Sequence, residues 1–186
     1  MEKKHGPWTI RARRERFRNE MMCVSEDDVT KPDGSEGTYA TVRMQDGVTV
    51  LAVDDEGAAY FASEFRYAIG RKTVEAVGGG VEEGEAPEEA ARRELREELG
   101  IEAAELTPLG AVQHMTSLVN SESALFLARG LSFTEKDGDP SERIETVKMP
   151  LDEAVSRALG GDFIHSTTCL LVLRAHHHLN AVVSSQ

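Results

Sequence analysis

Between Gly79 and Ile101 the chain reads GGVEEGEAPEEAARRELREELGI, a glycine-rich turn that leads into one strongly marked helix. Pro87 suits the first turn of a helix, and Gly100 suits a left-handed cap at its C-terminal end. Apolar residues recur at helical spacing and would pack against a sheet, namely Ala91, Leu95 and Leu99. Thr73–Val77, just before the glycines, reads as a short strand. The segment therefore predicts a strand, a tight loop and a helix in succession.

The same helix carries an acidic side. Each helical residue turns by roughly 100°, so Glu94, Glu97 and Glu98 point their carboxylates at one small volume. Carboxylates that close together repel one another. Either solvent screens them on an exposed face stabilised by charge pairs with interleaved arginines, or a hard divalent cation lies between the oxygens.

The composition of the chain indicates which kinds of binding partner are favoured. The chain has 186 residues, 40% of them hydrophobic, and a formal net charge of -12 from 33 acidic and 21 basic residues. This length predicts a single core and leaves enough residues for an appended arm. A surface so acidic repels nucleic acids and anionic membranes, which favours a small-molecule partner. With two cysteines, no leader segment and no apolar run near the ~20 residues that span a bilayer, we expect a cytoplasmic protein.

Two parts are expected along the chain. Residues 1–45 form an arm of extended segments, Trp8–Arg11 and Glu15–Val24 among them, followed by the polar segment Ser25–Gly37 with a turn at Lys31–Gly34. Residues 46–186 form the main domain. Its further strands are expected at Leu106–Gln113, Ala124–Ala128 and Glu145–Met149, and its further helices at Leu151–Leu159 and from Ser166 to about Val182.

A resemblance to a known family rests on fixed spacings. Gly79, then five residues, Glu85, seven residues and the run Arg93–Ile101 match every fixed position of the signature of Nudix hydrolases, the Nudix box. The resemblance implies a mixed α/β fold, an α/β/α sandwich with a mixed central sheet, here with an N-terminal antiparallel β arm. It also implies that Mg²⁺ or Mn²⁺ is held against the diphosphate of a nucleoside diphosphate derivative, which is then hydrolysed.

The residue types agree with that chemistry, because ligands that offer only oxygen suit hard cations. Glu94 and Glu98 are the first choices as metal ligands. Glu97 is either a third ligand or the base that takes a proton from the attacking water. The carbonyl of Gly78 or Gly79 could complete the coordination shell. Arg93 cannot release its proton and is expected to orient Glu97 or Glu85, and Glu85 itself could instead bind loop amides.

The stretch EFRYAIGRKTVEAVGGG resembles ADP-ribose pyrophosphatases within that family. On this resemblance Arg66 would contact a phosphate or sugar, and Glu75 would contact polar groups of the substrate. Glu122, on a predicted loop, matches a glutamate that binds metal or acts as a base in such enzymes, although a solvent-facing loop acid is equally compatible with the sequence. His114 could reach the site from the same region, but a lone histidine is more often structural.

The most favoured activity is Mg²⁺-dependent hydrolysis of a nucleoside diphosphate sugar, with ADP-ribose giving AMP and ribose 5-phosphate. One alternative is another Nudix substrate, such as a GDP-mannose-like sugar nucleotide, a dinucleotide polyphosphate or a nucleoside triphosphate. Another is a Nudix-fold sensor that binds ADP-ribose without cutting it. The resemblance also implies a homodimer in which the N-terminal arm contacts or exchanges with the partner. No nucleic-acid or membrane partner is expected.

Overall fold

The computed structural model describes residues 2–138 and 143–183, with side chains through Ala181. Met1, where the predicted arm begins, lies outside the described residues. The chain forms two compact units. The arm unit combines the residues up to Asp46 with Gln113–Glu122, and the main unit combines Gly47–Val112 with the chain from Ser123 onward. None of the described helices is both long and apolar enough to cross a membrane.

The arm unit is a five-stranded sheet in the order β1-β2-β3-β4-β10. Its strands are β1 (Lys3–His5), β2 (Trp8–Arg18), β3 (Met22–Thr30), β4 (Glu36–Met44) and β10 (Val119–Asn120). Neighbours from β1 to β4 run antiparallel, while β10 runs parallel to β4. The expected turn is present, since the backbone N–H of Gly34 donates to the carbonyl of Lys31 at 2.9 Å.

Two strand boundaries in the arm differ from the sequence expectation. The chain turns after Arg18, where the side chain of Asn19 accepts the backbone N–H of Met22 at 2.8 Å, so Glu15–Val24 is not one extended segment. The first six residues of the polar segment Ser25–Gly37 belong to strand β3. Opposite charges across β2 and β3 make this polar strand favourable, as in the pairs Arg13–Asp27, Arg14–Asp28 and Arg16–Glu26.

The main unit is built on a seven-stranded mixed sheet. Its strands are β5 (Gly47–Val53), β6 (Ala58–Arg66), β7 (Arg71–Glu75), β8 (Val77–Gly80), β9 (Ile101–Gln113), β11 (Glu122–Phe133) and β12 (Glu145–Pro150). The 3₁₀ turn η1 (Tyr67–Ile69) links β6 to β7. Strand β5 pairs in parallel with β11 and antiparallel with β6 and β8, which makes the sheet mixed.

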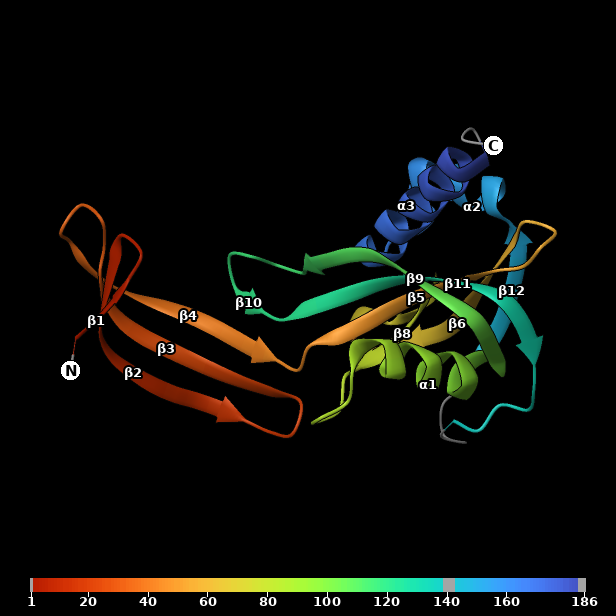
Figure 1. Ribbon diagram of the computed structural model, residues 1–186. Coiled ribbons are helices and arrows are strands. Elements are labelled where there is room, and N and C mark those ends of the chain that lie inside the picture. The colour runs from red at the N-terminus through yellow and green to blue at the C-terminus, as the bar shows by residue number, and fades with distance from the viewer. Residues whose placement is uncertain (1, 139–142, 184–186) are drawn as a thin grey trace. The chain divides into compact units, whose positions relative to one another are not determined.

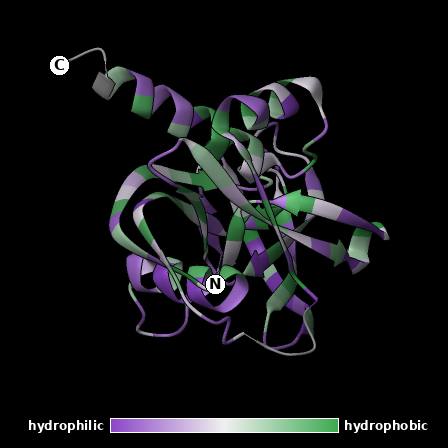
Figure 2. Ribbon diagram, turned by 90° about the vertical axis from the view of Figure 1, so that its right-hand side faces the viewer, coloured by the Kyte–Doolittle hydropathy of each residue, from purple (hydrophilic) through white to green (hydrophobic). Residues whose placement is uncertain are grey.

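Helices cover both faces of this sheet (Figure 1). They are α1 (Pro87–Leu99), α2 (Leu151–Gly160) and α3 (Ser166–Val183). Side chains alternate along β5, so Val48 and Val50 pack in one cluster with α1, whereas Leu51 and Val53 pack with α2 and α3. Hydrophobic and hydrophilic residues alternate along many strands in Figure 2. The predicted α/β/α sandwich with a mixed central sheet and an antiparallel β arm is confirmed.

Helix α1 begins and ends where its sequence predicts. Gly100 caps it at φ 63°, and its backbone N–H donates to the carbonyl of Arg96 at 3.0 Å. The expected apolar stripe is buried, together with Ala90. Glu89 stands four residues before Arg93, a spacing that favours a charge pair. Glu89 instead accepts the backbone N–H of Ala86 at 3.0 Å, because the first-turn amides of a helix have no partner within it.

Candidate active site

The glycine-rich loop and helix α1 meet so closely that a side chain at one loop position would displace a neighbouring group. Strand β8 pairs with β5 through Gly79 and Val48. A Cβ atom added at Gly79 would lie 2.0 Å from Oε1 of Glu94, well inside van der Waals contact. The backbone of the loop therefore rests directly against the carboxylate of Glu94. Strand, loop and helix together hold carboxylate and carbonyl oxygens side by side.

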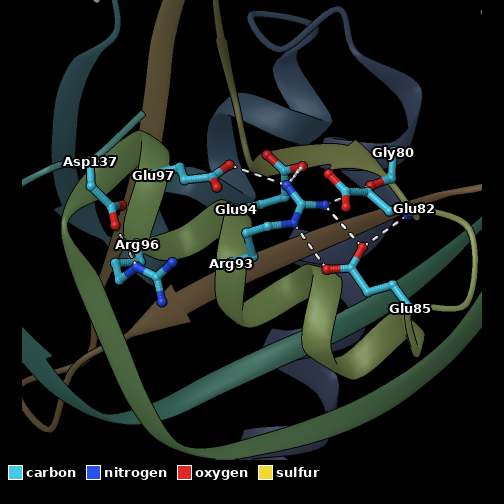
Figure 3. Close-up of polar contacts among 8 residues, drawn as sticks. All are labelled: Gly80, Glu82, Glu85, Arg93, Glu94, Arg96, Glu97 and Asp137. Carbon is cyan, nitrogen blue, oxygen red and sulfur yellow. Dashed lines mark hydrogen bonds and ion pairs between the residues drawn. The ribbon is translucent and has the colours of Figure 1, made fainter. Parts of the chain in front are cut away.

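Arg93 is the centre of this site (Figure 3). Its Nε and Nη2 donate to the two carboxylate oxygens of Glu85 at 2.9 and 3.1 Å, and Nη2 also donates to the carbonyl of Gly80 at 2.8 Å. On its other side Nη1 donates to Glu94 at 2.7 Å and to Glu97 at 3.1 Å. A single guanidinium thus connects the loop with Glu94 and Glu97 of helix α1. Arg93 was expected to orient Glu97 or Glu85, and it contacts both.

Glu85 holds the loop in shape. Its Oε2 accepts the backbone N–H of Glu82 at 2.9 Å while both of its oxygens bind Arg93. Hydrogen bonds from Arg93 and from Glu82 keep the pKa of Glu85 below its ordinary value. The same partnership with Glu85, followed by that with Glu94, raises the pKa of Arg93. Glu85 therefore binds a loop amide, as the structural interpretation of the sequence expected, and it stays ionised at neutral pH.

The remaining oxygens suit a divalent cation. The side chains of Glu94 and Glu97 are 13% and 31% exposed, and Glu98 on the same side is half-buried. Arg93 contributes one positive charge against the three carboxylates that it contacts, those of Glu85, Glu94 and Glu97. The excess negative charge and the all-oxygen donor set match a hard ion such as Mg²⁺. Glu94, Glu97, Glu98 and the carbonyl of Gly78 could hold it.

Comparisons with known proteins identify this strand-loop-helix element. The model of the NUDIX domain matches residues 43–168, more than half of the chain. The chain belongs to the Nudix family. It is 33% identical over 146 residues to an ADP-ribose pyrophosphatase of Bacillus subtilis (strain 168), covering 77% of this chain and 79% of that protein. It is 29% identical over 162 residues to an ADP-ribose pyrophosphatase of Mycobacterium tuberculosis (strain ATCC 25618 / H37Rv), covering 84% and 77%.

The fold of this Nudix protein matches a solved structure over almost its whole length. A crystal structure of an ADP compounds hydrolase superposes with a TM-score of 0.83 at 23% identity, covering 96% of this chain and 97% of that one. Together with the family match, the relatives identify the chain as a Nudix pyrophosphohydrolase. Nudix hydrolases use divalent metal ions. Among the described residues, no three His, Cys, Asp or Glu side chains are gathered as a complete metal-binding group. An ion such as Mg²⁺ usually keeps several waters and shares substrate phosphates, so an incomplete set of protein ligands is compatible with it.

A second polar group lies at the end of β6 and on β7, also in the main unit. Arg66 donates through Nη2 to Oε2 of Glu75 at 2.9 Å and contacts Glu64 at 2.6 Å. The hydroxyl of Thr73 donates to Oε1 of Glu75 at 2.7 Å. Burial would raise the pKa of Glu75, but the hydrogen bonds from Arg66 and Thr73 outweigh it and leave that pKa below its ordinary value. The negative charge of Glu98 also favours the protonated form of Arg66.

Glu122 belongs to the arm unit and is the first residue of strand β11, so its expected position on a loop is wrong. Strand pairing extends to this end of β11, where Ser123 lies opposite Gly47 of β5. The backbone N–H of Glu122 donates to Asp46 at 2.9 Å, and its Oε2 accepts the side-chain amide of Gln113 at 3.2 Å. His114 is exposed at a bend of the same unit.

Sequence reasoning missed Glu64 and Thr73 of the second polar group, and it also missed His165. Nδ1 of His165, just before α3, lies 3.5 Å from Oε2 of Glu75 and 2.9 Å from the hydroxyl of Thr168. Ninety residues separate His165 from Glu75. No spacing rule relates two positions so far apart, and only the packing of α3 against the sheet brings them together.

Proposed function

We propose that this Nudix hydrolase cleaves the pyrophosphate bond of a nucleoside diphosphate sugar with the help of Mg²⁺ or Mn²⁺, and that ADP-ribose, giving AMP and ribose 5-phosphate, is its preferred substrate. The observation that carries the proposal is the bridge made by Arg93 between the loop and the acidic side of α1. Two relatives named ADP-ribose pyrophosphatase support the choice of substrate. The free thiols Cys23 and Cys169 are compatible with a cytoplasmic setting.

The proposed roles follow from the contacts. Glu94, Glu98, Glu97 and the carbonyl of Gly78 would hold the cation. When bound, it would neutralise charge on the diphosphate and lower the pKa of water beside it. Glu97 would accept the proton of the attacking water, and Arg93 would keep the carboxylate of Glu97 oriented for that transfer.

Substrate binding is assigned to the second polar group and to the glycine loop. The side chain of Arg66 is 39% exposed, whereas that of Glu75 is 9% exposed. The guanidinium of Arg66 therefore has N–H donors that can bind a phosphate, while its contact with Glu75 fixes its orientation. Gly79 would let the substrate approach the loop backbone closely. Glu122 is proposed as a further metal ligand or base.

A substrate panel tests the proposal. Nucleotide sugars, dinucleotide polyphosphates and nucleoside triphosphates are incubated with the enzyme and Mg²⁺ or Mn²⁺, and products are identified by ³¹P NMR. We expect ADP-ribose to give AMP and ribose 5-phosphate. Glu98→Gln should lower kcat at least about 100-fold with the fold retained, because it removes a metal ligand. Glu88→Gln, on the same helix but away from the cluster, should keep wild-type activity, and Glu122→Gln tests the additional role of Glu122.

Other outcomes would assign a different function. Turnover of a GDP-mannose-like sugar nucleotide, a dinucleotide polyphosphate or a nucleoside triphosphate in place of ADP-ribose would identify another Nudix activity. Tight binding of ADP-ribose with no turnover in Mg²⁺ would favour a sensor. Wild-type activity of Glu98→Gln would remove Glu98 from the site.

We also propose that the protein is a homodimer formed through the arm unit. A groove of this unit is lined by polar and apolar side chains, and the apolar ones include Trp8, Ile10 and Met22 from strands and Leu118 from the turn before β10. Two of its lining side chains, Tyr39 and Leu118, are 39% exposed. Exposed apolar side chains with polar residues around them are typical of a protein–protein interface. A second copy of the chain is the partner that the proposal assigns to it.

A further inference from the structure

The imidazole of His165 lies between a hydroxyl and a carboxylate. On one side is the hydroxyl of Thr168, 2.9 Å from its Nδ1, and on the other is the carboxylate of Glu75, with Oε2 at 3.5 Å. Thr168 is fully buried, and its hydroxyl oxygen accepts the backbone N–H of Ala76 at 2.9 Å. A hydroxyl can donate or accept, so the contact with Thr168 suits both the neutral and the protonated imidazole.

The charge state of His165 affects Arg66 through Glu75, because the carboxylate of Glu75 contacts both residues. Its Oε2, the oxygen nearest to His165, is the oxygen that accepts both Nη2 and Nε of Arg66, at 2.9 and 3.3 Å. The positive charge of a protonated His165 lowers the pKa of Glu75, as the contact with Arg66 also does. Two cations then share one buried carboxylate, and each is neutralised less completely.

Several other charged groups lie around this chain of contacts. Glu64 contacts Arg66 directly, and the charge of Glu98 acts on Arg66 as well. A cavity of about 180 Å³ lies beside Phe163 and Ile164, which precede His165 in the chain. Its charged lining residues are Arg71, Lys72, Arg157 and Asp162. Lys72 and Arg157 contact acids of their own, Glu145 and Glu153.

We infer that His165 is a positioning residue that sets, through Glu75, how much of the positive charge of Arg66 is available to an anionic substrate. The inference rests on the proposed function, in which Arg66 contacts the nucleotide sugar. When His165 is neutral, Glu75 neutralises Arg66 more completely. When His165 is protonated, Arg66 attracts the diphosphate more strongly. The affinity for the substrate therefore rises as the pH falls through the titration of His165.

Steady-state kinetics with ADP-ribose between about pH 6 and pH 8.5 test the inference. For the wild type, KM should be lower at the acidic end. His165→Gln, which carries no charge at any pH, should raise KM roughly 3- to 10-fold at the acidic end, leave it unchanged at the alkaline end, and change kcat less than about twofold. The matched control is His177→Gln, an exposed histidine on α3, which should follow the wild type. Coincidence of the His165→Gln and wild-type KM profiles would overturn the inference.

A second measurement reads the coupling in the free protein. The pKa of His165, followed by NMR of its imidazole ring, should fall by about half a unit or more in Glu75→Gln, because a neighbouring carboxylate favours the protonated imidazole. An unchanged pKa would refute the link through Glu75, whether or not His165→Gln folds. If wild-type enzyme turns over no nucleotide sugar, the proposed function falls and the inference falls with it. If wild type turns over ADP-ribose and the two KM profiles coincide, only the inference fails.

Discussion

Gly79 is the residue at which the loop backbone lies against a proposed metal ligand. A Cβ atom there would overlap the carboxylate of Glu94, so Gly79→Ala must displace either the loop or a proposed metal ligand. We expect kcat to fall roughly 10- to 100-fold and metal affinity to fall with it, as for other losses of ligand positioning. Gly160→Ala is the control, because a Cβ atom there meets nothing within 4 Å. Equal activities of Gly79→Ala and wild type would show that this close contact has no catalytic role.

The polar contacts of single residues were predictable only where sequence spacing fixes them. Arg93 and Glu97, four apart on one helix, meet as expected. Glu89 has the same spacing from Arg93 but binds the backbone of Ala86, because capping and pairing compete for one side chain. His165 depends on tertiary packing, which no local pattern encodes.

The hairpin between β5 and β6 makes the stability of the fold depend on pH. Asp54 accepts the backbone N–H of Ala58 at 2.8 Å and the hydroxyl of Tyr60 at 3.0 Å, and it pairs with Lys148 at 2.9 Å. Burial alone would raise the pKa of Asp54, but these partners outweigh it and lower the pKa from 3.8 to about 2. A carboxyl whose pKa is lower in the folded state stabilises the fold above its unfolded pKa. That contribution is lost as the pH falls from about 3.8 through about 2.

Asp54→Asn should therefore lose stability at neutral pH and lose less than the wild type on acidification. Urea unfolding at about pH 6 and about pH 2.5 measures both effects. Asp55→Asn is the control, since the side chain of Asp55 is 89% exposed and its pair with Arg129 is at the surface. Parallel loss of stability in Asp54→Asn and wild type would contradict the assignment to Asp54.

At the level of elements, prediction succeeded where apolar periodicity was strong. Helix α1 and strand β12 lie close to their expected bounds, because caps, proline and alternation mark their ends. Strand β3 was missed in part because cross-strand ion pairs, rather than apolar residues, stabilise it. The pattern of apolar residues gives no information about ion pairs between strands.

The whole molecule is predicted to associate through its arm. Sedimentation at micromolar concentration should give a mass of twice 20.4 kDa. Leu118→Glu places a charge in the groove of the arm unit and should shift the protein towards monomer, because burying an unpaired charge is costly. Leu159→Glu, at an exposed position on α2, should remain dimeric. A monomeric wild type would rule out the proposed interface.

The central claim is that the acidic side of α1 binds a divalent cation together with a diphosphate. The most direct test is Mn²⁺ binding, followed by electron paramagnetic resonance, with and without a non-hydrolysable methylene analogue of ADP-ribose. We predict binding by the wild type that the analogue strengthens, a loss of roughly 10-fold or more in Glu98→Gln, and no change in Glu88→Gln. Failure of the wild type to bind Mn²⁺ with the analogue present or absent would contradict the claim.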